Sequence, residues 1–106
     1  MLQDIRMADG TRRFGDLPET HDAGHPQWHR LRDHVSQLPG AAVTGFVTDD
    51  VAEAWIDFIH RGHAFSINNQ AGDWWFFVED PTCPDAILTQ VLDHFEVLLV
   101  AEHGPR

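Results

Sequence analysis

The stretch 54–79 constrains the fold of this chain most strongly, because it has the pattern of three antiparallel strands joined by two tight turns. Three runs in it are rich in aromatic and β-branched residues, as strands are: 54–60, 63–70 and 73–79. The dipeptides Arg61-Gly62 and Ala71-Gly72 separate these runs, and short links that contain Gly are typical of β-hairpins. The stretch therefore predicts a three-stranded meander.

Two-residue turns would also fix the register of this meander. The first turn places Phe58 opposite Phe65, and the second places Ile67 opposite Phe76. Both turns bring the same apolar residues to one face, namely Ile56, Phe58, Phe65, Ile67, Phe76 and Val78. A shift of one residue would scatter this set over both faces. We therefore expect this face to lie against the core.

The opposite face of the meander mixes large aromatic residues with amides and a carboxylate. In the predicted register, Trp55, Asn68 and Trp75 form one cross-strand row. Asp57, Ser66 and Phe77 form the next row. A wholly solvated face is expected to be polar, whereas aromatic residues are enriched at binding surfaces. Either another segment covers this face or it binds a partner, in which case the candidate residues are Trp55, Asp57, Asn68, Gln70, Trp75 and Phe77.

Length and charge limit the class of protein. A chain of 106 residues suits a single domain, 1–106, that buries a core without a disulfide or a metal. Its formal charge of −10 argues against nucleic acid or an anionic membrane as partner and favours a basic protein or metal cations. The single Cys83 excludes an internal disulfide and fits a cytoplasmic location. No signal peptide pattern is visible, and no apolar run is long enough to span a bilayer.

The N-terminal part, 1–25, is expected to form a hairpin followed by a loop, with some flexibility. Asp9-Gly10 is a strong cue for a type I′ turn, which would place Ile5 opposite Phe14. Such a hairpin either extends the sheet or lies over its aromatic face. The only basic cluster of the chain is here, and we expect it to dock on the chain's own carboxylates, with an acidic ligand as the alternative: Arg6, Arg12 and Arg13.

Two helices and one more strand complete the expected fold. Apolar residues at helical spacing predict a short first helix that begins at Pro26 and buries Trp28, Leu31, Val35 and Leu38. The run 41–48 predicts a strand in which Gly45 marks a bulge or a bend. A wide apolar face predicts the last helix over 84–102. The predicted class is α+β: an antiparallel sheet of about four strands with an N-terminal and a C-terminal helix packed on one face.

Histidines invite a metal hypothesis in two places. His21, His25 and His29 have four-residue spacing, but a helix that begins at Pro26 leaves only His29 and Asp33 on one helical face. No Cys joins them, so a tight zinc site is not expected. His60 and His63 face each other across the first turn of the meander, and two ligands alone bind a metal weakly.

Carboxylates crowd the connection that precedes the meander, and hard cations prefer several oxygen ligands. The spacing of a calcium loop is absent, so no resident metal or cofactor is expected. The weak metal candidates of the whole chain are His25, His29, Asp33, Asp49, Asp50 and Glu53.

Nucleophilic catalysis finds little support in the sequence. Cys83 lies where the last helix is expected to begin, and a helix N-terminus can lower a thiol pKa. No His or Asn partner can be placed beside it. A nucleophile elbow, a phosphate-binding Gly loop and a dinucleotide fingerprint are all missing from the sequence. We therefore expect a non-enzymatic protein.

One local motif has a counterpart in a known family. Asn68-Asn69-Gln70, followed by Trp75 on the next strand, resembles the frataxin family, whose third strand carries Asn-x-Gln and whose next strand carries Trp. In that family the exposed sheet face with these residues contacts the iron–sulfur scaffold partner, and acidic residues of the first helix and strand bind iron weakly. The resemblance implies a protein-binding role for Asn68, Gln70 and Trp75. The chain as a whole resembles small uncharacterised bacterial α+β proteins, which implies no activity.

Three functional classes follow from the sequence. The first is a protein-interaction domain that uses the outer aromatic face of its sheet, with a basic protein as the favoured partner. The second is a frataxin-like protein that binds and handles metal weakly. The third is a small ligand-binding protein or enzyme with its site over Asp57, Asn68 and Trp75. A homodimer through the C-terminal helix or the sheet face stays open beside all three.

Overall fold

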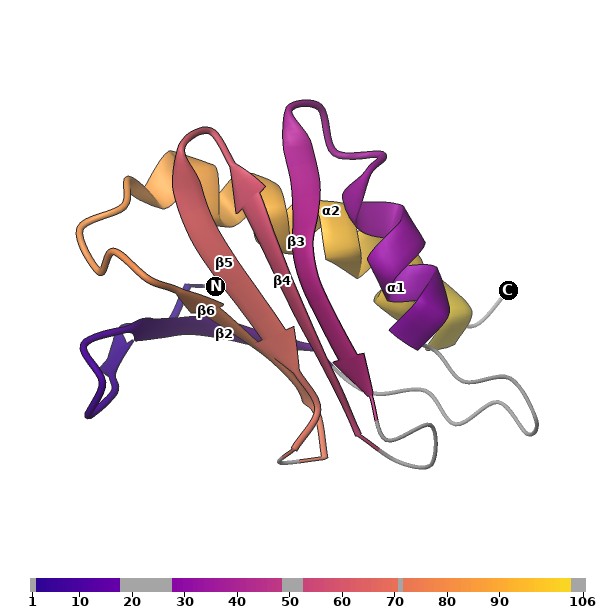
Figure 1. The fold of residues 1–106 in the computed structure, drawn as a ribbon, viewed down its shortest axis with the longest axis horizontal. Helices are drawn as coiled ribbons and strands as arrows, with labels where there is room; N and C mark the ends of the chain where they lie inside the picture. The colour runs from indigo at the N-terminus through magenta and orange to yellow at the C-terminus, as the bar shows by residue number, and fades with distance from the viewer. Residues whose placement is uncertain (1, 18–27, 49–52, 71, 104–106) are drawn as a thin grey trace.

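The computed structural model describes residues 2–17, 28–48, 53–70 and 72–103. Over these residues the chain forms six strands and two helices, in the order β1 (Ile5–Arg6), β2 (Arg12–Leu17), α1 (Trp28–Val35), β3 (Ala41–Thr48), β4 (Ala54–His60), β5 (His63–Asn68), β6 (Trp74–Val78) and α2 (Asp85–His103). The strands form one antiparallel sheet in the order β1-β2-β6-β5-β4-β3 (Figure 1).

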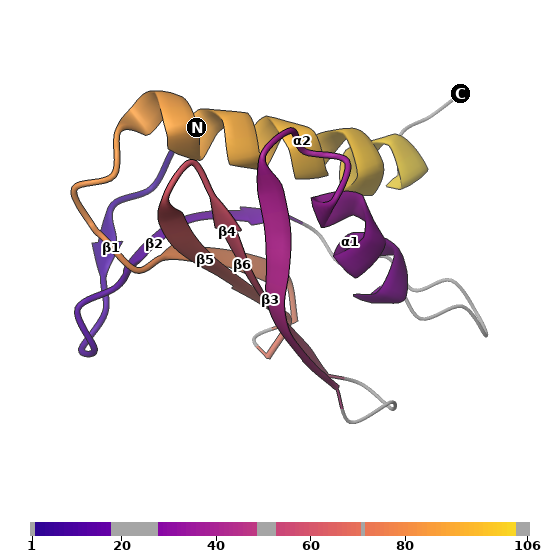
Figure 2. The same ribbon diagram turned by 45° about the horizontal axis from the view of Figure 1, so that its top comes forward.

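The molecule has two layers, a twisted sheet and a pair of helices. Both helices lie on the same side of the sheet, with α2 running across it and α1 beside β3 (Figure 2). The α+β class predicted from the sequence is therefore confirmed. The sheet has six strands instead of about four, because the N-terminal hairpin pairs with β6 and lengthens the sheet.

The predicted register of the meander is confirmed on both sides of β5. Ile67 pairs with Ile56 and with Phe76, and Phe65 pairs with Phe58 and with Val78. All six residues are buried. Arg61 and Gly62 both have positive φ, 51° and 78°, as a type I′ turn requires. The face that alternation and turn geometry assigned to the core is the face covered by the helices.

The second link of the meander is longer than the two residues expected. β5 ends at Asn68 and β6 begins at Trp74, although the register across the link is unchanged. Asn69 is buried, and its side-chain Oδ1 accepts a 2.8 Å hydrogen bond from the Ala54 N–H. This amide ties the end of β5 to the start of β4. The sequence pattern did not predict that contact.

The register of the N-terminal hairpin differs by one residue from the predicted register. Ile5 pairs with Arg13 and not with Phe14. In the turn, Gly10 has a φ of +91° while Asp9 does not have positive φ, which excludes type I′. The Met7 N–H donates to the Thr11 carbonyl at 2.9 Å, so the loop is one residue longer than expected. Arg13 pairs with Phe77 of β6 and shares the outer face of the sheet with it.

The core fills the space between the sheet and the helices. Phe14 packs edge-on against Phe65 and Phe76, with ring centroids 5.8 and 6.2 Å apart. Phe95 of α2 contacts Phe58 and Phe76 from the other side. The apolar stripe predicted for the first helix is buried as expected: Trp28, Leu31, Val35 and Leu38. Pro26, the predicted helix start, lies outside the described residues.

Candidate functional site: the outer face of the sheet

The outer face of the sheet is defined by the side chains that point away from the helices on β2 to β6. Trp55, Asn68 and Trp75 form the cross-strand row predicted from the sequence, called here the outer row. Val47 of β3 continues it at one end and Asp16 of β2 at the other. No described helix or strand lies over this face, since the hairpin joins the edge of the sheet (Figure 2).

The exposure of this face is graded. Trp55, Asn68 and Trp75 are half-buried, because the side chains of neighbouring strands shield their flanks. Phe77, in the next row, is also half-buried, whereas Asp57 is exposed. Toward the β3 edge the face opens further, with Val47 62% exposed. Aromatic rings that neighbouring side chains hold in place and leave partly exposed form a firm platform that another molecule can contact.

Arg13 is a member of this face that the sequence reasoning missed. Its guanidinium carbon lies 3.9 Å from the centroid of the Trp75 ring, which is a cation–π contact. Trp75 also meets Phe77, with ring centroids 6.3 Å apart. The Arg13 Nε is buried without a hydrogen-bond partner among the described residues. Alternation with the buried Phe14 would have indicated this placement.

Gln70 differs from the other predicted site residues. It is exposed in the link after β5, and its backbone N–H donates to Asn68 Oδ1 at 3.3 Å. The Asn68 side chain therefore has a structural task, since it caps the beginning of the link. The structure brings Trp55, Asp57, Asn68, Trp75 and Phe77 together on adjacent strands and leaves Gln70 beyond their ends.

Three of the weak metal candidates lie among the described residues, and these three do not form a site: His29, Asp33 and Glu53. The His29 ring packs against Phe46, with centroids 5.6 Å apart, and Asp33 accepts hydrogen bonds from Arg32 at 3.1 Å. Glu53 is half-buried at the start of the meander. His25, Asp49 and Asp50 lie outside the described residues. Within the described ranges, no group of three or more His, Cys, Asp or Glu side chains suits a metal ion.

Histidines instead connect the layers of the fold. His60 pairs with His63 in the register, as predicted, but His60 is fully buried with its Nε2 3.1 Å from Gln90 Oε1. The rings of His34 in α1 and His94 in α2 stack with centroids 3.9 Å apart. Each ring donates from Nε2 to the backbone carbonyl of the other residue at 2.7 Å. Burial lowers the pKa of His94; the hydrogen bond to the His34 carbonyl opposes this shift, and the charges of the His34 and His60 rings add to it.

The environment of Cys83 raises the pKa of its thiol, although a helix N-terminus can lower a thiol pKa. The thiol is buried, and burial raises its pKa, with further contributions from the Asp80 and Asp85 carboxylates. Desolvation and these two negative charges disfavour a thiolate more than the helix N-terminus favours it. Cys83 is thus a packing residue at the start of α2.

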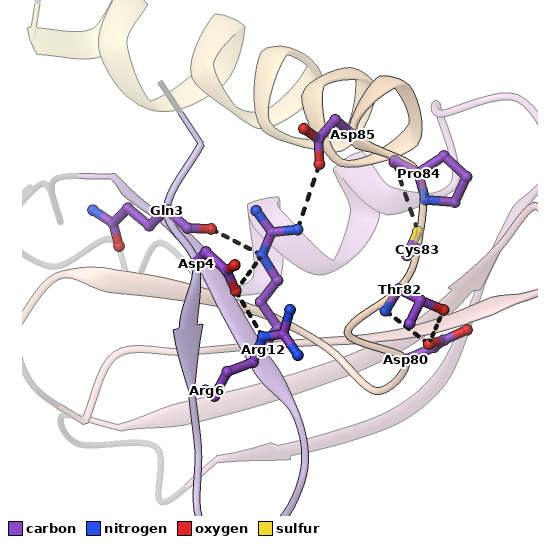
Figure 3. A network of polar contacts seen from close by, with 9 residues as sticks. All are labelled: Gln3, Asp4, Arg6, Arg12, Asp80, Thr82, Cys83, Pro84 and Asp85. Carbon is purple, nitrogen blue, oxygen red and sulfur yellow. Dashed lines mark hydrogen bonds and ion pairs between the residues drawn. The ribbon is translucent and has the colours of Figure 1, made fainter.

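The N-terminal arginines dock in the way the sequence favoured, with one exception. Arg12 is buried and lies 3.4 Å from both Asp4 and Asp85, while its Nε donates to the Gln3 carbonyl at 2.9 Å (Figure 3). Arg6 donates to Asp4 at 2.7 Å, and this hydrogen bond lowers the Asp4 pKa. Arg13 is the exception, because its guanidinium lies on the Trp75 ring and not beside a carboxylate of the described part of the chain.

A shallow pocket of about 260 Å³ lies elsewhere, between the N-terminal part and α2. Leu2, Gly15 and Leu17 line one wall, and Leu92, Asp93 and Glu96 are among the residues on the other. It contains none of the predicted site residues.

Comparison with protein-family models, with curated proteins and with solved structures finds no match. Over the described residues, no helix is long and apolar enough to cross a membrane.

Proposed function

We propose that this protein is a non-enzymatic interaction domain that binds another protein through the outer row and its neighbours. The observation that carries the proposal is the row of Trp55, Asn68 and Trp75 on a face that no described element covers. Tryptophan is enriched among the residues that dominate binding energy at protein interfaces. A half-buried Trp also loses little side-chain entropy on binding, because neighbouring strands already restrict it.

The charge around the outer row favours a basic partner. Asp16 and Asp57 are exposed on this face, and the chain carries a formal charge of −10. Among the residues that the structure describes, the cation beside the row is Arg13, which lies on the Trp75 ring. A basic partner would meet carboxylates around an aromatic centre, and long-range attraction would speed its association. We place this interaction in the cytoplasm, in keeping with a single buried Cys83.

Tryptophan fluorescence tests the accessibility that the proposal requires. The four tryptophans divide into Trp55 and Trp75 on the outer face and Trp28 and Trp74 in the core. Variants that keep a single Trp, with Phe at the other three positions, should show strong acrylamide quenching for the outer pair and weak quenching for the inner pair. Equal, weak quenching of all four would contradict an open face.

Trp75→Ala tests the binding role directly. Truncating an anchor of this kind costs about 2 kcal/mol or more of binding free energy, which is about thirtyfold in affinity. Proteins that crosslink to a photoreactive residue at position 66, in the row beside the outer row, identify the partner, whose affinity is then measured by calorimetry. Trp75→Ala should weaken that affinity while the domain stays folded. Val97→Ala, at an exposed position on α2, is the control that should leave it unchanged.

A further inference from the structure

The two edges of the sheet are protected very differently. β1 is two residues long and carries Arg6, whereas β3 is eight residues long and carries no charge. Natural edge strands are usually short, charged or interrupted by Pro, because an open edge can pair with another chain. On β3, Val43 and Val47 are 37% and 62% exposed. The edge at β3 is therefore suited to pairing with an added strand.

A bare position in β3 gives this edge a specific chemical feature. Gly45 lies opposite Asp57 at a bulge, where the register shifts after Val43. A Cβ on Gly45 would lie 3.2 Å from Asp57 Oδ2, so the carboxylate leans over the backbone of Gly45. Asp57 is exposed and makes no hydrogen bond or ion pair with the residues that the structure describes. A carboxylate of the second strand is thus reachable from the free edge.

We propose that the β3 edge binds an extended, basic segment of the partner, which pairs with β3 and places an Arg or Lys side chain across Gly45 onto Asp57. This inference rests on the proposed function and names its partner chemistry. Adjacent strands are about 4.8 Å apart, so the added strand would lie about 10 Å from β4. A long basic side chain covers that distance because no side chain at position 45 stands in between.

The neighbouring position adds a second element of recognition. Val47 lies next to Trp55 on the outer face and is exposed at the edge. A side chain two residues from the bound cation would point to the same face and lie beside Val47. The expected segment therefore alternates a basic and an apolar residue on its outward side.

Charge argues against a second copy of this chain as the occupant. β3 has the sequence Ala-Ala-Val-Thr-Gly-Phe-Val-Thr, so a second β3 would bring no cation to Asp57. Each copy would also bring a formal charge of −10. A basic segment can pair with the β3 backbone and also bring a cation to the Asp57 carboxylate.

Two blocked peptides test the inference. The probe has the sequence Thr-Val-Thr-Arg-Thr-Val-Thr, which is symmetrical and so suits either strand direction, and the control has Glu in place of Arg. Titration followed by backbone amide NMR should shift the amides of β3 and slow their hydrogen exchange. Calorimetry should show the Arg peptide binding about fivefold more tightly than the Glu peptide. Asp57→Asn should remove that preference.

Two exposed valines supply matched variants. Val47→Lys should weaken binding of the Arg peptide about fivefold by like charge at the edge, and Val97→Lys on α2 should not change it. Equal affinity for both peptides, or shifts away from β3, would overturn the inference. A dimer in sedimentation that Val47→Lys dissolves would overturn it too, because a second copy would then occupy the edge.

The two proposals fail separately. Trp75 lies on β6, three strands from the edge, so Trp75→Ala should bind the Arg peptide as the unmodified protein does. Peptide binding at β3 without an effect of Trp75→Ala on partner affinity would contradict the proposed function alone. Loss of the partner in Trp75→Ala, with no peptide binding at β3, would contradict the edge site alone.

Discussion

Two rows of side chains cross the meander one residue apart and end in different environments. Ile56, Ile67 and Phe76 are fully buried beneath the helices. The outer row, one position earlier on β4 and β6 and one later on β5, is half-buried on the open side of the sheet. Both rows carry large side chains, so size alone does not separate them.

The difference lies in the polar member of the outer row. A purely apolar row can be buried at no polar cost, whereas Asn68 would need hydrogen-bond partners beneath a layer of Leu and Phe side chains. Both helices lie on one face of the sheet (Figure 2), and the row buried on that face contains no amide. In a sheet that is covered on one side, the core face is therefore better identified by a cross-strand row without polar side chains than by a row with many aromatic residues.

Adjacent phenylalanines on β6 offer the sharpest test of this comparison. Phe76→Ala opens a cavity in the core and should lower the free energy of unfolding by about 3–5 kcal/mol. Phe77→Ala removes the same atoms from the open face and should cost about 1 kcal/mol. Urea denaturation of both variants measures the difference. Equal losses would mean that the outer face is a second core.

Two Gly→Ala variants test the same contrast between the covered and the open face, because each adds one methyl group. A Cβ on Gly15 would lie 2.6 Å from Leu92 Cδ1 beneath α2, so Gly15→Ala should destabilise the fold by about 1–3 kcal/mol. In Gly45→Ala the added Cβ would lie 3.2 Å from Oδ2 of the exposed Asp57, a looser contact, so this variant should cost less. Thermal unfolding of the pair measures both. A milder effect at Gly15 than at Gly45 would contradict the tight contact between β2 and α2.

Acid should lower the stability of the fold through the histidine pair that joins α1 and α2. The folded state lowers the His94 pKa below its ordinary value of 6.5, so folding favours the neutral ring. The stabilisation is complete above pH 6.5 and is lost as the pH falls through the lowered pKa, because the unfolded chain then binds a proton more readily.

Stability measured from pH 7.5 to 5 should fall, and His94→Gln should reduce the slope. An unchanged slope in that variant would show that the pair does not couple protonation to folding. NMR titration of the His94 ring gives the direction of its pKa shift independently.

The smallest expected effect concerns the arginine on the outer face. Arg13→Gln removes the cation above Trp75 and should cost about 0.5–1 kcal/mol of stability. It should also raise the acrylamide quenching of Trp75, because the ring loses its cover. Arg12→Gln, one residue away but buried among carboxylates, should cost more without changing that quenching. Identical quenching in both variants would contradict the Arg13 contact.

Local chain chemistry could predict most of the fold. Alternation on β4, β5 and β6 predicted their pairing, and the helical spacing of Trp28, Leu31 and Val35 predicted the buried side of α1. The Gly45 bulge was also predicted, since a residue without a side chain weakens regular pairing. The turn at Asp9-Gly10 was right in place and wrong in type, because two turn types accept the same dipeptide.

What the sequence determined by itself was periodicity and therefore the two faces of the meander, because period and turn depend on neighbours along the chain. Only the tertiary structure decided that β2 lies beside β6, that Arg13 covers Trp75, and that His34 stacks on His94. These contacts join residues far apart in sequence, and their geometry depends on how the layers pack. A one-residue slip in a hairpin or the crossing of two helices leaves no periodic trace in the sequence.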